Sequence, residues 1–141
     1  MSKAKEYTCY KVVAVNDFYV SRYPSKYASV NIEIGLKHCL FYSIGEVTKP
    51  IVGRIYVFRQ YDDAVNFAKA ILLNSRYAKI FKCVCGHMVK ERYRLSGYIS
   101  DHEIELFWPD RKKPIPGKFL SKVPDGTFTT EWVKPVEIMS Y

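Results

Sequence analysis

One segment of this chain has the periodicity of an amphipathic helix, and strand-like patterns flank it on both sides. The helix pattern begins at Asp62, which can cap the first turn, and its apolar residues recur at the i, i+3, i+4, i+7 spacing. These residues are Ala64, Val65, Phe67, Ala68, Ile71 and Leu72. Because a lone helix must bury its apolar stripe, we expect it to pack on a sheet and to end near Asn74 or Ser75.

The two segments next to the helix pattern are predicted strands. Residues 54–59 carry apolar side chains on both faces, which is typical of a central strand. Residues 78–89 alternate more regularly, and one face would hold Phe81, Cys83, Cys85 and His87. Connection rules favour a strand, helix, strand unit whose two strands are parallel neighbours.

The rest of the chain is rich in short strand patterns and turn signals. Val123 to Gly126 places Pro and Gly as a tight turn requires, and the proline-rich residues 110–117 predict a loop. Residues 18–27 are expected to form a short edge strand or a loop, because Pro24 argues against a central strand. Further strands are predicted at 7–15, 29–34, 39–44, 104–108, 127–133 and 136–139. The sequence therefore predicts an α+β fold, mainly an antiparallel twisted sheet with one principal helix packed on it.

The length of the chain and its N-terminal residues limit the number of domains and the location that we expect. A chain of 141 residues has the size of one domain, so residues 1–141 are expected to fold as a unit. No apolar run reaches the roughly 18 residues of a membrane span, and no secretory signal is visible. We expect a cytoplasmic protein without a membrane partner. Its four cysteines, Cys9, Cys39, Cys83 and Cys85, are then expected to be reduced thiols.

The charge balance points to acidic partners. The formal net charge is +8, and aromatic residues make up 16% of the chain. Two basic groups are interleaved with or lie near aromatic residues. The first group is Arg76, Lys79, Lys82, Lys90, Arg92 and Arg94, and the second is Arg111, Lys112, Lys113, Lys118 and Lys122. A solvated rim that keeps the protein soluble is the alternative explanation.

Guanidinium groups bind phosphate oxygens in pairs, and aromatic rings stack on bases. This mixture suits a nucleotide or a single-stranded nucleic acid. The candidate phosphate-binding residues are Arg54, Arg59, Arg92, Arg94 and Arg111. The candidate stacking residues are Tyr93, Phe107 and Trp108.

Signals for metal binding and catalysis are weak. The Cys83-x-Cys85-x-His87 spacing differs from the Cys-x-x-Cys of zinc knuckles, and no histidine is placed to activate a cysteine nucleophile. Asp101, Glu103 and Glu105 could share one strand face, but a solvated face explains them as well. No phosphate-binding glycine loop or nucleophile elbow is present. We expect no metal, no cofactor and a binding protein rather than an enzyme.

Several short segments spread along the chain together form a pattern of strand, turn and core residues. They are Tyr10-Lys11-Val12-Val13; Tyr42-Ser43-Ile44-Gly45 before Pro50 and Gly53; Val57-Phe58 before Ala64 and Phe67-Ala68; and Pro124-Asp125-Gly126-Thr127 before Val133-Lys134-Pro135. The pattern resembles small proteins encoded by bacteriophages and large DNA viruses. Some of these are anti-defence factors, including Thoeris anti-defence sponges that sequester nucleotide-derived immune signals. The resemblance implies a role in the host cytoplasm and assigns no ligand residues.

A fainter resemblance links the order strand, helix, strand in residues 57–84 to ADP-ribosyltransferase folds. Only Glu131 is loosely placed to match the catalytic glutamate of those enzymes, and their other motifs are missing.

The leading hypothesis is a non-enzymatic, viral-type protein that captures a nucleotide or a nucleotide-derived signal and counters host defence. The alternatives are a single-stranded nucleic-acid-binding protein, an ADP-ribosyltransferase-like enzyme, and a protein inhibitor of an acidic host enzyme. Association into a homo-oligomer stays open.

Overall fold

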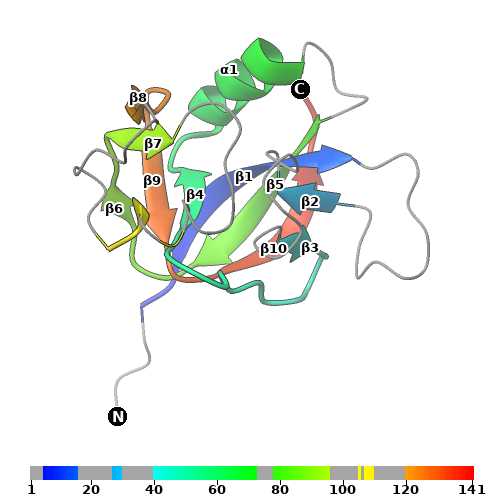
Figure 1. Ribbon diagram of the computed structural model, residues 1–141. Coiled ribbons are helices and arrows are strands. Elements are labelled where there is room, and N and C mark those ends of the chain that lie inside the picture. Colours follow the sequence, from blue (N-terminus) through cyan, green and yellow to red (C-terminus); the bar gives the residue numbers. More distant parts are fainter. Residues whose placement is uncertain are drawn as a thin grey trace.

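The computed structural model describes residues 5–15, 27–29, 40–72, 78–95, 105, 107–109 and 120–141 (Figure 1). The described chain contains one long helix, α1 (Tyr61–Leu72), and ten strands. The strands before the helix are β1 (Tyr7–Val15), β2 (Tyr27–Ser29), β3 (Phe41–Tyr42) and β4 (Ile55–Phe58). Those after it are β5 (Ala78–Cys85), β6 (Val89–Lys90), β7 (Tyr93–Leu95), β8 (Leu120–Lys122), β9 (Thr127–Thr130) and β10 (Val133–Met139).

Eight of these strands form one sheet in which every pairing is antiparallel. Six lie in the order β10-β5-β1-β4-β9-β6, and β2 pairs with the end of β1 and with β3. The longest ladder joins β1 to β5, from Tyr7 opposite Cys85 to Ala14 opposite Ala78. Strands β7 and β8 form a separate two-stranded sheet. The predicted α+β class, with a twisted antiparallel sheet and one principal helix, is confirmed.

The central part of the sheet differs from the expected strand, helix, strand unit. Strands β4 and β5 run in the same direction, since both are antiparallel to β1, but β1 lies between them. The prediction that they are neighbours is wrong. Strand β1 has buried residues on both faces, including Cys9 on one and Val12 on the other, and a central position buries both at once.

Helix α1 lies over one face of the sheet (Figure 1). Its buried residues Ala64 and Ala68 pack against Val12, Phe58 and Ile80. The helix begins at Tyr61, one residue before the predicted cap, so Asp62 lies in the first turn with Asp63, where both carboxylates favour the positive end of the helix. The described helix ends at Leu72, and the predicted end near residues 74 and 75 lies outside the described residues.

The other face of the sheet carries the larger apolar cluster. It consists of Cys9, Val13, Tyr42, Ile55, Val57, Phe81, Cys83, Cys85 and Val133. Three free cysteines belong to it, and Cys9 lies directly opposite Cys83 on the neighbouring strand. These thiols are reduced core residues in this structure, whereas Cys39 lies outside the described residues.

Two strand predictions need correction, and a third falls almost entirely outside the described residues. Glu105 and Phe107 have helical backbone conformation, so the strand expected at 104–108 is wrong; a short apolar run does not distinguish a strand from a helical turn. The strand expected at 127–133 ends at Thr130, and β10 runs from Val133 through Pro135 to Met139 with a register shift after Pro135. Of the strand expected at 29–34, only Ser29 is described, and it ends β2.

Candidate anion-binding site

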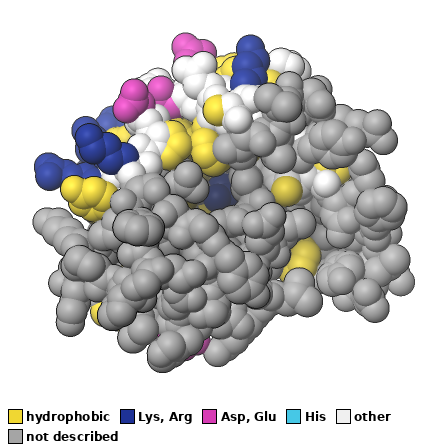
Figure 2. All heavy atoms as spheres, turned by 45° about the horizontal axis from the view of Figure 1, so that its top comes forward, with side chains coloured by type: hydrophobic (Ala, Val, Ile, Leu, Met, Phe, Trp, Pro, Cys, Tyr) yellow, Lys and Arg dark blue, Asp and Glu magenta, His cyan; other side chains and the backbone are white. Residues whose placement is uncertain are grey.

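Several basic side chains lie at one end of the molecule. In the view of Figure 2, Lys and Arg side chains lie together on the left, the side that holds β6, β7 and β9 in Figure 1. Pairing of β7 with β8 produces this arrangement, because Tyr93 lies opposite Lys122 and Arg94 lies opposite Ser121. Lys122 of the second basic group of the sequence therefore lies next to the segment that carries Arg92 and Arg94 of the first group.

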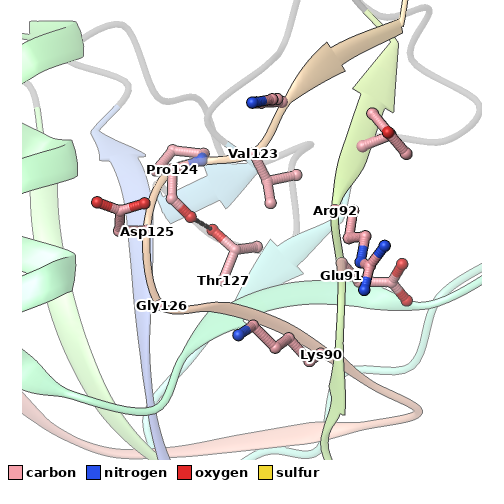
Figure 3. A pocket seen from close by; sticks show the side chains of 10 residues that line it. Lys90, Glu91, Arg92, Val123, Pro124, Asp125, Gly126 and Thr127 are labelled. Carbon is pink, nitrogen blue, oxygen red and sulfur yellow. Dashed lines mark hydrogen bonds between the residues drawn. The ribbon is translucent and has the colours of Figure 1, made fainter.

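A pocket of about 540 Å³ opens between the segments that carry Arg92 and Lys122. One wall is formed by residues 90–93, which join β6 to β7, and the other by residues 122–127, which join β8 to β9. Figure 3 shows the two segments side by side, with the Thr127 side chain in the space between them. The volume is within the range of small-ligand sites.

The pocket exists because the two segments differ in length between their points of pairing. The amide of Glu91 donates to the carbonyl of Thr127 at 3.3 Å, and the amide of Val123 donates to the carbonyl of Arg92 at 3.0 Å. Between these bonds one segment continues directly from Glu91 to Arg92, while the other makes a turn through Pro124, Asp125 and Gly126. The additional residues bow outward and leave the space.

The turn that forms the second wall is held in place. The amide of Thr127 donates to the carbonyl of Pro124 at 3.2 Å, and the Thr127 hydroxyl donates to the same carbonyl at 2.6 Å. Gly126 has φ 80°, the value of the third residue of a type II turn. The Asp63 carboxylate packs so closely on Gly126 that a Cβ there would overlap it. The tight turn expected at 123–126 is present, but it lies one residue further along, from Pro124 to Thr127.

Three cationic side chains that border the pocket have no partner among the described residues. Lys90, Arg92 and Lys122 are exposed, and within the described part of the chain none of their side chains makes a hydrogen bond or an ion pair. The half-buried Tyr93 adds an aromatic ring to the lining. The structure thus places two of the predicted ligand residues, Arg92 and Tyr93, at one site.

A network of hydrogen bonds fixes an acidic side chain in the wall of the pocket. Glu91 is 8% exposed, and its Oε1 accepts a hydrogen bond from the Thr129 hydroxyl at 2.8 Å. The same hydroxyl oxygen accepts a bond from Nε of Arg54 at 2.9 Å. The Arg54 guanidinium also donates to the carbonyls of Thr129 and His87, each at 3.2 Å. Its NH1 lies 3.5 Å from Oε1 of Glu131, so the predicted phosphate ligand Arg54 is used within the protein.

The remaining predicted phosphate ligands lie around or outside the site. Arg59 is exposed and directly follows Phe58, which lies opposite Thr127 at the edge of the pocket. The backbone of Arg94 belongs to β7, and its side chain is not described. Arg111 lies outside the described residues, as do Asp101 and Glu103 of the predicted acidic face.

Two predicted stacking residues lie behind the pocket wall. Phe107 is only 3% exposed, and its ring centroid is 5.3 Å from that of Trp108. The Trp108 ring packs over the backbone of Gly53 and lies 5.4 Å from the Tyr56 ring. The Tyr56 hydroxyl donates to the carbonyl of Tyr93 at 3.1 Å. Tyr56 thus contacts the Trp108 ring and bonds to the backbone of Tyr93, and Phe107 offers almost no surface for stacking.

Sequence reasoning did not single out Lys11, which lies on the face of β1 that carries the larger apolar cluster. Its Nζ donates to the carbonyl of Tyr56 at 2.7 Å and lies 5.8 Å from the centre of the Tyr42 ring. Burial lowers the pKa of Lys11 from 10.5 to about 8, and the neighbouring thiols of Cys83 and Cys9 oppose this shift. The signal for this residue was a lysine in the middle of an otherwise apolar strand.

The thiols next to Lys11 form a tight cluster of their own. Hydrogen bonds with Cys83 and Cys85, together with burial, raise the pKa of Cys9 above its ordinary value. Among the described residues, no group of three or more His, Cys, Asp or Glu side chains has an arrangement that could hold a metal ion. Within the same residues, no helix is both long enough and apolar enough to cross a membrane.

Comparison with known proteins adds no relative to this picture. No protein-family model matches the chain, no curated protein matches it, and no solved structure matches its fold.

Proposed function

We propose that the protein binds a phosphate-bearing ligand, a nucleotide or a nucleotide-derived signal, and releases it chemically unchanged. The observation that carries the proposal is the meeting at one pocket of two segments that are distant in the sequence. Lys90, Arg92 and Lys122 border that pocket, and their charges have no partner among the described residues; Tyr93 supplies a ring. Lys and Arg heads bind phosphate oxygens, while a tyrosine ring can stack on a base.

The kinds of side chain in the lining support binding without turnover. Among the described residues that line the pocket there is no Ser, Cys or His, so these residues do not provide the pairing of nucleophile and base that covalent hydrolytic chemistry uses. In the setting suggested by the resemblance to phage proteins, such binding would withdraw a signalling nucleotide from solution.

Titration calorimetry with AMP, ADP, ATP and NAD tests the proposal. We expect binding to the wild-type protein and a loss of about tenfold in affinity in Arg92→Gln and in Lys122→Gln, since each removes a charged donor. The matched control is Lys134→Gln, which removes the same charge from an exposed position on β10, at the opposite edge of the sheet. Ligand recovered from the complex should have an unchanged mass.

Two results would contradict this proposal. One is the absence of binding to all four nucleotides, and the other is an equal loss of affinity in the pocket variants and the control. The same titrations with a short single-stranded oligonucleotide at two salt concentrations separate a pocket from a groove. A much steeper salt dependence for the oligonucleotide, with tighter binding than any nucleotide, would assign the site to nucleic acid instead.

A further inference from the structure

The pocket contains negative as well as positive side chains. Lys90, Arg92 and Lys122 are offset by Glu91 and Asp125, which line the same space. Arg54, next to Glu91 through Thr129, is itself paired with Glu131. The lining therefore presents three positive and two negative formal charges, a balance that phosphate binding alone does not explain.

Glu91 is not free to swing away from a bound anion. The residue is 8% exposed, and its Oε1 accepts a hydrogen bond from the Thr129 hydroxyl at 2.8 Å. Thr129 is in turn fixed by Nε of Arg54 at 2.9 Å and belongs to β9, where it lies opposite Tyr56. A negative charge held in place near a binding site repels every additional negative charge that the ligand brings.

Asp125 adds a second carboxylate on the opposite wall. It is exposed, and its side chain makes no hydrogen bond or ion pair within the described residues. The turn does not require an acid at this position, because type II turns favour proline as their second residue. Any anion in the pocket therefore lies between two walls that each contain one carboxylate.

On the basis of the proposed function, we propose that Glu91 and Asp125 make the pocket selective for ligands of one or two negative charges, a phosphodiester or a monophosphate, over polyphosphates. The cations then supply attraction for a single phosphate group. The two carboxylates exclude the longer phosphate chains that the same cations would otherwise prefer.

A ligand series that differs in charge tests this selectivity. The dinucleotide ApA, AMP, ADP and ATP are titrated in the presence of EDTA, so that no divalent cation neutralises the phosphates. For the wild-type protein we expect ApA or AMP to bind about tenfold more tightly than ATP. In Glu91→Gln, which keeps the acceptor for Thr129 and removes the charge, we expect this ratio to fall to about one or to reverse.

Two further variants complete the experiment. Asp125→Asn changes an exposed turn residue and should shift the ratio in the same direction, whether or not Glu91→Gln folds. The control Glu46→Gln removes the same charge from an exposed loop residue and should leave the ratio at its wild-type value.

Tighter binding of ATP than of AMP by the wild-type protein would overturn the selectivity while leaving the proposed function intact. So would an unchanged ratio in both pocket variants. Absence of binding to every member of the series would instead overturn the proposed function itself, and the selectivity with it.

Discussion

Replacement of Lys11 by methionine should make the stability of this protein less dependent on pH. The ammonium group lies on an apolar sheet face, and burial lowers its pKa from 10.5 to about 8. At pH 7 this gap corresponds to a cost of about 3 kcal/mol in the free energy of folding. Between pH 8 and pH 10.5 the unfolded chain binds the proton more strongly than the folded chain does. The cost is therefore complete below pH 8, and it disappears as the pH rises toward 10.5.

The variant also loses two favourable contacts. The bond from Nζ to the Tyr56 carbonyl, 2.7 Å long, and the approach to the Tyr42 ring together contribute about 1–2 kcal/mol. We therefore expect Lys11→Met to be more stable than wild type by about 1–2 kcal/mol at pH 7 and less stable by about 1 kcal/mol at pH 10. The difference between the two proteins should change by about 2.5 kcal/mol over this range, whatever the lost contacts contribute.

Urea unfolding followed by tyrosine and tryptophan fluorescence, at pH 7, 8, 9 and 10, measures this difference. The contribution of tyrosine ionisation cancels in this difference, because both proteins contain the same tyrosines. Lys134→Met, at an exposed position of β10, reports the effect of net charge alone. Parallel stability curves for wild type and Lys11→Met would refute the reasoning, because they would mean that burial does not perturb the lysine.

Two further substitutions test the supports behind the pocket. Gly53→Ala should lower the free energy of unfolding by about 2–4 kcal/mol, because Gly53 has φ 72° and an added Cβ would overlap the Trp108 ring; urea unfolding checks this, and a change below about 0.5 kcal/mol would contradict it. Thr129→Val removes the hydroxyl between Arg54 and Glu91 and should cost about 2–3 kcal/mol, whereas Thr129→Ser keeps the hydroxyl and should recover most of that loss. Equal unfolding midpoints for the Val and Ser variants would show that the hydroxyl contributes nothing.

Local patterns predicted the main elements of this fold well. The strand expected at 7–15 matches β1, the central strand expected at 54–59 contains β4, and the helix pattern matches α1 apart from its first residue. These segments have strong periodicity, which depends only on near neighbours in the sequence. The same patterns contain no information about which strands pair. The position of β1 between β4 and β5 follows from burial of both its faces, a property of the whole sheet.

The candidate site was only partly predictable for the same reason. Its cations were visible as two basic groups, and Arg92 and Tyr93 were named from their composition. Their meeting depends on the pairing of β7 with β8 and on the unequal lengths of the segments that follow, neither of which composition encodes. Arg54 is the opposite case. An arginine suggested a phosphate ligand, but in the fold this side chain bonds to Thr129 and Glu131 instead.

The central position of β1 also affects when the sheet can form during synthesis of the chain. Residues 7–15 are translated long before their neighbours in β5, since Ala14 pairs with Ala78 and Tyr7 pairs with Cys85. Until then the nascent chain carries a segment that is apolar on both sides and lacks its principal partner. Contacts between such distant positions make folding slow. The ladder between β1 and β5 can therefore form only after β5 has been translated, and an apolar segment that is exposed until then favours aggregation.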